Sequence, residues 1–166
     1  DRLVELFQPK KVVPATVEFV DIAGLVRGAS KGEGKGNAFL SNIRDADAVA
    51  HVVRCFEDEN VLHVDNKVDP IADIETIETE LILKDLETVQ KRLDKAQRAA
   101  KGQDAFEKKA LALCERLEAS LNEGKPASAV QPADEDEAIA FRDMFLLTSK
   151  PSFFVANVKE EQLADV

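Results

Sequence analysis

The first residues able to do chemistry are an acid and a glycine three positions apart, Asp21 and Gly24. The acid ends a short, mostly apolar run that predicts a strand over 15–21. A carboxylate at a strand end can hold Mg²⁺ through water, and a glycine amide can face a phosphate. Short motifs recur by chance, so the same pair can also do no more than end a strand and form a turn. The pair is therefore a candidate phosphate site whose interpretation depends on its surroundings.

The residues that follow this pair are rich in glycine, with five glycines between positions 24 and 36. Because glycine leaves the backbone free, we expect this segment to need a ligand or partner to hold one conformation. Leu25 stands where many nucleotide hydrolases carry a glutamine that orients the attacking water. His63, in a polar loop, is a candidate for that role, and the alternative is an ordinary surface histidine. His51 lies inside an apolar run, which predicts a packed, hydrogen-bonded core histidine.

A second polar group, Asn157-Val158-Lys159-Glu160, follows a predicted strand over 152–157. At the corresponding place GTP hydrolases carry Asn-Lys-x-Asp, whose Asp accepts hydrogen bonds from the N1–H and 2-amino groups of guanine. Adenine offers an N6 donor and an N1 acceptor instead, so the longer Glu160 loosens guanine recognition. The alternative is a strand-end asparagine followed by a solvated glutamate.

The glycine cluster does not contain a Walker A loop, G-x-x-x-x-G-K-[ST], although Gly34-Lys35 suggests one. That loop would require glycine at position 29 and serine or threonine at position 36, where the chain has Ala29 and Gly36. The cluster is not a dinucleotide fingerprint either, because from Gly32 it reads G-x-G-x-G and no strand directly precedes it.

Composition narrows the class of protein. The chain has 166 residues, 45% of them apolar, which suffices for one domain or one domain with an insertion. A net charge of −10 excludes nucleic-acid binding through bulk electrostatics, so we expect no direct DNA binding. No apolar run approaches the length of a membrane span. The two cysteines, Cys55 and Cys114, have no metal-ligand spacing and suit a reduced pair in the cytoplasm.

The predicted elements alternate between strand and helix, which favours an α/β fold with a parallel sheet. The three expected strands are 15–21, 48–56 and 152–157, the second of them buried on both faces. Within residues 1–13 we expect a short amphipathic helix, then a turn at Pro9 and a link up to Pro14. Further helices are expected over 37–44 and 135–147.

The connection between the last two strands is far longer than a crossover needs. Apolar residues spaced by three to five predict one helix over 73–102 and a second over 106–121. The two form an αα-hairpin, or short coiled coil, expected to project from the α/β body.

Taken together, these residues resemble the YchF family of Obg-related P-loop nucleotide hydrolases, also known as ribosome-binding ATPases. The resemblance rests on the run from Phe19 to Val64 (FVDIAGLVRGASKGEGKGNAFLSNIRDADAVAHVVRCFEDENVLHV) and on Asn157 to Glu160 (NVKE). It implies a partial P-loop NTPase (G-domain) parallel sheet with an inserted helical coiled-coil hairpin. It also implies hydrolysis of ATP in preference to GTP, Mg²⁺ as cofactor, and association with the ribosome or a ribosomal subunit as a switch linked to translation or stress.

The resemblance assigns roles to individual residues. Asp21 binds Mg²⁺ through water, and Gly24 faces the γ-phosphate. His63 assists hydrolysis in place of the missing glutamine. Three residues contact the nucleotide base: Asn157, Val158 and Glu160.

The resemblance also implies how the chain is divided. We expect 1–68 and 138–166 to form part of a G domain and 69–137 to form the inserted helical domain. The phosphate-binding loop is expected before Asp1 and a further domain after Val166, so the chain alone is expected to be inactive. The alternative function is a non-catalytic binding module, in which the hairpin docks a ribosomal or protein partner.

Overall fold

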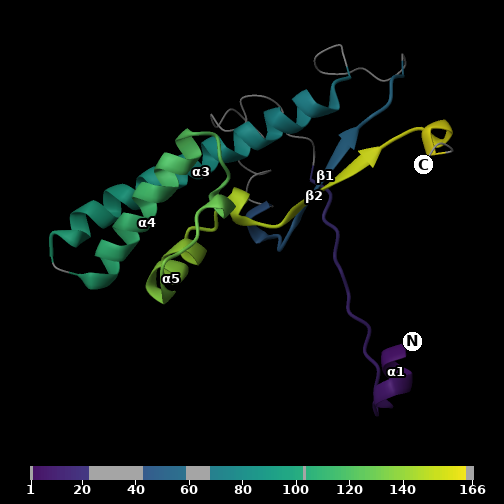
Figure 1. Cartoon of the computed structure of the whole chain (residues 1–166), viewed down its shortest axis with the longest axis horizontal. Coiled ribbons are helices and arrows are strands. Elements are labelled where there is room, and N and C mark those ends of the chain that lie inside the picture. Colours follow the sequence, from purple (N-terminus) through teal and green to yellow (C-terminus); the bar gives the residue numbers. More distant parts are fainter. Residues whose placement is uncertain (1, 23–42, 59–67, 103, 164–166) are drawn as a thin grey trace.

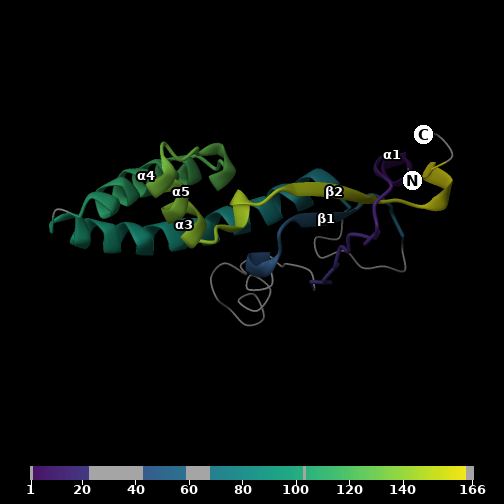
Figure 2. The same ribbon diagram turned by 90° about the horizontal axis from the view of Figure 1, so that it is seen from below.

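The structure is a computed structural model that describes residues 2–22, 43–58, 68–102 and 104–163. Two parallel strands, β1 (Val49–Arg54) and β2 (Ser152–Asn157), form its sheet. A helical part, joined to the sheet by the long connection, extends to one side of it (Figures 1 and 2). The α/β class and the projecting helical hairpin are thus confirmed.

The two strands run in register from Val49 opposite Ser152 to Arg54 opposite Asn157. The amide of Val49 donates to the carbonyl of Pro151 at 2.9 Å, and the amide of Cys55 donates to that of Asn157 at 2.8 Å. Because the strands are parallel, their carboxyl ends lie at the same edge of the sheet.

The first helix of the hairpin is α3 (Pro70–Ala100). Asp69 caps it, since its carboxylate accepts the amide of Ala72 at 3.2 Å, and Pro70 at the first helical position needs no amide partner. The helix ends where the amide of Gly102 bonds to the carbonyl of Ala99 at 2.9 Å. These bounds confirm the predicted long helix and its stop at Gly102.

The second helix, α4 (Ala105–Asn122), begins at Asp104, whose carboxylate accepts the amides of Phe106 and Glu107. At its other end Gly124 adopts a φ of 74°, a left-handed conformation that glycine reaches without strain. The amides of Gly124 and Lys125 then bond to carbonyls of the last turn at 3.0 Å each. This arrangement is a Schellman motif, and it explains why the helix stops at Gly-Lys-Pro.

The core lies between α3, α4 and the short α5 (Glu135–Asp143). Apolar side chains from the helices and from the turns that join them fill it: Val89, Leu93, Ala110, Leu113, Cys114, Leu117, Leu121, Ala127, Ala140, Met144 and Leu146. Burial raises the pKa of the Cys114 thiol to about 11. The thiol is therefore protonated and inert in the folded chain, as expected of a reduced structural cysteine.

An ion pair fastens α5 to α4. Arg116 donates to both carboxylate oxygens of Glu137, at 3.2 and 2.6 Å, and the amide of Ala133 donates to the same carboxylate. The Arg116 hydrogen bonds lower the pKa of Glu137, which is almost fully buried. The pair fixes the path by which the chain leaves the hairpin.

Helix α5 is shorter than the predicted 135–147. The helix ends at Asp143, and Phe145, two residues later, takes a left-handed φ of 48° that the helix could not continue through. A single 3₁₀ turn, η3 (Leu147–Ser149), then leads into β2. Two further turns of this kind are η2 (Ala127–Ala129) and η4 (Glu160–Leu163).

Two predictions about the sheet side are wrong for this structure. The stretch 15–21 is extended but forms no ladder, because no strand of the described part pairs with it, and Phe19 is 81% exposed. The first helix, α1 (Arg2–Phe7), ends before Pro9, as predicted, and lies apart from the rest (Figure 1). Strand β1 is not buried on both faces, since Val52 is 69% exposed.

Other predicted features lie outside the described residues: Gly24, the rest of the glycine-rich segment, most of the helix over 37–44, and His63. Of that helix only residues 43–45, which are helical, are described. None of the helices that the structure describes is long and apolar enough to cross a membrane.

Candidate functional site

The carboxyl ends of β1 and β2 bring together residues that are about 100 positions apart in the chain. Asn157 ends β2 opposite Arg54, and its side chain is exposed. Ligands of parallel α/β sheets bind at this edge, where loops leave the strands. The structure therefore places the first predicted base-contacting residue at the edge where a nucleotide would bind.

The turn after Asn157 presents the other two predicted residues. Val158 is half-buried, and Glu160 is exposed as the first residue of η4. An exposed carboxylate at the start of a turn can accept hydrogen bonds from a base without first losing a protein partner.

Gln162 holds this turn, although no motif in the sequence pointed to it. Its side-chain oxygen accepts the amide of Lys159 at 2.8 Å, and its side-chain nitrogen donates to the carbonyl of Cys55 at 3.2 Å. One side chain thus bridges the turn after β2 to the end of β1. The only signal in the sequence that could have indicated this role is that Gln162 lies two positions after Glu160, a predicted base contact.

The chain leaving β1 is also held in place. Arg54 donates to the carbonyl of Phe56 at 2.9 Å, and its guanidinium carbon lies 4.8 Å from the centre of the Phe56 ring. These contacts fix the direction of the segment that runs on toward His63, which lies outside the described residues.

Asp21 is exposed at the end of the described stretch 2–22. Within the described part of the chain its carboxylate has no hydrogen-bond partner, and no group of three or more acidic, histidine or cysteine side chains could hold a metal. Mg²⁺ in nucleotide sites needs only one or two carboxylates, because waters and phosphates fill its remaining positions. A single free carboxylate therefore fits the metal that the resemblance implies.

His51 is half-buried in β1, with its ring centre 5.2 Å from that of Phe154 on β2. Burial lowers its pKa, which the more distant charge of Glu78 partly opposes. The two rings are tilted by 54°, so His51 packs against the neighbouring strand, which confirms the packing part of the prediction.

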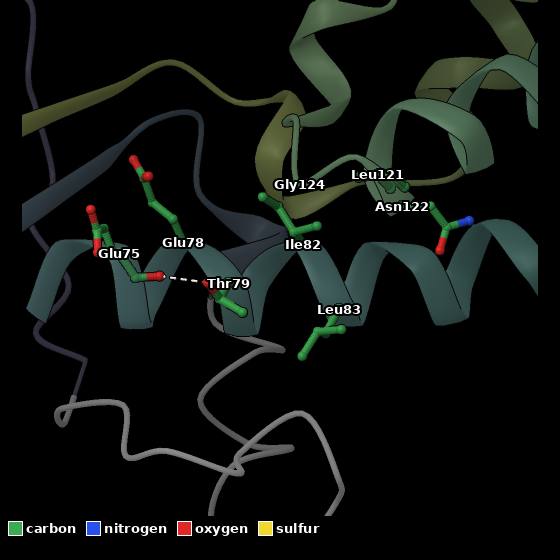
Figure 3. A pocket seen from close by; sticks show the side chains of 8 residues that line it. All are labelled: Glu75, Glu78, Thr79, Ile82, Leu83, Leu121, Asn122 and Gly124. Atoms are coloured by element: carbon green, nitrogen blue, oxygen red, sulfur yellow. Dashed lines mark hydrogen bonds between the residues drawn. The ribbon is translucent and has the colours of Figure 1, made fainter. Parts of the chain in front are cut away.

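A groove of about 450 Å³ lies on the hairpin, between α3 and the end of α4 (Figure 3). Ile82 and Leu121 supply apolar surface, and Glu75 and Glu78 supply carboxylates. A triphosphate would be repelled there, because the groove offers like charge and no cationic side chain. The lining of this groove therefore does not suit a triphosphate.

Comparison with known proteins shows which proteins this chain is similar to. A family model described as "50S ribosome-binding GTPase" matches residues 6–101. The chain is 50% identical over 164 residues to "Ribosome-binding ATPase YchF" of Bacillus subtilis, and 48% identical over 161 residues to the protein of the same name of Escherichia coli O157:H7. Those alignments cover 99% and 97% of the chain.

A solved structure, that of the Schizosaccharomyces pombe YchF GTPase, superposes with a TM-score of 0.76 at 36% identity. It covers 99% of this chain, and the chain covers 45% of it. The chain likewise spans only 44% of the length of the two bacterial relatives.

Proposed function

The chain belongs to the YchF family of ribosome-binding ATPases, and we propose that it supplies the base-binding edge and the helical hairpin of a nucleotide-hydrolysing protein. The proposed reaction is hydrolysis of a nucleoside triphosphate, with ATP preferred over GTP. The proposed role of the whole protein is a ribosome-associated switch linked to translation or stress. The observation that carries the proposal is the shared carboxyl edge of β1 and β2, which presents Asn157, Val158 and Glu160.

The described residues suit binding of the base more than chemistry at the phosphate. Asn157 and Glu160 offer exposed polar groups at the strand ends, whereas the described stretches contain no loop of the Walker A type. Mg²⁺ would supply charge neutralisation at the phosphates, and Asp21 would hold it through water. Gly24 and His63 keep their proposed roles at the γ-phosphate and in hydrolysis. The division at 69–137 into an inserted helical domain stays part of the proposal.

A change of base selectivity tests the proposal. The double substitution Val158→Lys with Glu160→Asp restores the Asn-Lys-x-Asp pattern in the whole protein. We expect the ratio of GTP affinity to ATP affinity to rise about tenfold or more, because one well-placed hydrogen bond to a charged group contributes about 1.5–3 kcal/mol. Calorimetric titration with each nucleotide at constant Mg²⁺ measures the ratio.

Lys159→Ala is the matched control, because Lys159 lies between the two altered positions and its side chain is exposed. It should leave the ratio within about twofold, below the effect of one hydrogen bond. An unchanged ratio in the double variant, or an equal change in the control, would contradict the assignment of the base site.

The alternative, a non-catalytic hairpin that docks a ribosomal or protein partner, is favoured by one observation. The hairpin projects from the sheet and carries an open acidic groove between α3 and the end of α4 (Figures 2 and 3). If the whole protein binds its ribosomal partner equally with and without nucleotide, and hydrolyses none, the alternative replaces the first proposal.

A further inference from the structure

A charged side chain lies buried where the hairpin meets the strands. Asp85, in the middle of α3, is only 1% exposed. One of its oxygens accepts the amide of Leu147 at 2.7 Å, and the other accepts the amide and the hydroxyl of Thr148 at 2.8 and 2.7 Å. A buried carboxylate is costly unless it is hydrogen-bonded in this way, so its position in the fold is specified closely.

These hydrogen bonds replace a cap that the local sequence does not provide. The 3₁₀ turn η3 has Leu146 before its first residue, and that position makes no side-chain capping bond. Asp85 caps the turn from 62 residues away in the chain. The segment that leads into β2 is therefore held by α3 and not by its own neighbours.

Thr148 extends the contact to a third segment. Its hydroxyl donates to Asp85 and accepts the amide of Ala127, in η2, at 2.8 Å. The exit from α4 and the start of β2 are thus joined at one side chain. A displacement of the hairpin would be transmitted to both.

The start of β1 is fastened to the same helix. Arg44 donates to the Thr88 hydroxyl, three residues beyond Asp85, at 3.3 Å, and its charge attracts the Asp85 carboxylate. Lys150 donates to the carbonyl of Ala46 at 2.6 Å, which ties the start of β2 to the start of β1. Helix α3 therefore fixes where both strands begin.

We infer that Asp85 is a positioning residue for the nucleotide base, acting through η3 and β2 on Asn157 and Glu160. Strand β2 begins three residues after η3 ends, and Asn157 is its sixth and last residue. When Asp85 no longer caps η3, the start of the strand loses its anchor to the hairpin and the turn at its far end moves. This inference rests on the proposed function, and it makes the hairpin part of the base site.

The experiment uses the whole protein and two ligands, ATP and tripolyphosphate, each with Mg²⁺. Asp85→Asn removes the charge and one acceptor, and Thr148→Val removes the hydroxyl while leaving the backbone bonds. For both variants we expect ATP to bind about tenfold more weakly, the scale of coupling through a packed network. The affinity for tripolyphosphate should stay within about twofold of the wild-type value, because this ligand has no base and does not contact the base site.

Two controls and one structural readout accompany these titrations. Asp94→Asn changes an exposed carboxylate of the same helix, and Thr148→Ser keeps the hydroxyl; both should bind ATP as wild type does. Hydrogen exchange without nucleotide should be faster over residues 147–157 in Asp85→Asn and Thr148→Val only. If Asp85→Asn does not fold, the ATP affinity of Thr148→Val compared with that of Thr148→Ser tests the inference.

Equal weakening of ATP and tripolyphosphate would show that Asp85 only stabilises the domain and would overturn the inference. Normal ATP affinity in Thr148→Val, despite faster exchange, would also overturn it. Failure of the wild-type protein to bind ATP would instead overturn the proposed function, and this inference with it.

Discussion

Leu117→Ala is expected to lower the free energy of unfolding by about 3 to 4 kcal/mol, the cost of a cavity at a fully buried leucine. Leu117 lies on the face of α4 that packs on α3, and none of its side chain is exposed. Urea unfolding followed by circular dichroism measures the loss.

The matched control is Leu83→Ala, on the part of α3 that lines the groove, where the leucine is 41% exposed. Its cost should stay below about 1.5 kcal/mol, because much of that side chain is already in water. If the two substitutions cost the same, the packing of α4 on α3 described above is wrong.

Asp21→Asn in the whole protein is expected to slow Mg²⁺-dependent hydrolysis about 100-fold, the usual effect of removing one group that stabilises charge in the transition state. The substitution keeps the shape of the side chain and removes its negative charge, which is the property that would hold the metal. Steady-state hydrolysis of ATP at saturating Mg²⁺ measures the effect.

Glu18→Gln is the control, since Glu18 is an exposed acid three positions earlier on the same extended stretch. It should leave the rate within about threefold, as expected of a charge that is screened by solvent. A rate for Asp21→Asn equal to that of the control would remove Asp21 from the proposed metal site.

The helical part of the fold could be predicted because its signals are local. The apolar rows, the caps at Asp69 and Asp104, and the stops at Gly102 and Gly124 are all encoded within a few residues of where they act. Strand β2 was predicted for the same reason, since Pro151 and an unbroken apolar run mark its bounds.

The stretch 15–21 shows where local signals fail. Its residues favour a strand, but a strand forms only when another backbone pairs with it, and neither β1 nor β2 does so. The burial of β1 was mispredicted for a similar reason. An apolar run shows that a strand can be buried on both faces, but it does not show whether another element covers each face.

Asp85 could have been noticed in the sequence. It stands four residues after Leu81 and four before Val89, in the apolar row that faces the core. A charge in such a row predicts a buried partner, but its partners lie 62 and 63 residues away and no spacing rule finds them. The bridge made by Gln162 was missed for the same reason, since it spans 107 residues.

Photoaffinity labelling tests the central claim most directly, the claim that the turn after β2 receives the nucleotide base. The whole protein would be irradiated with an ATP analogue that carries an azide on adenine, with Mg²⁺, and the labelled peptide identified by mass spectrometry. The account predicts label on the peptide that contains Asn157 to Gln162, lost on addition of excess ATP. Label that ATP displaces from the hairpin alone, with none on that peptide, would contradict it.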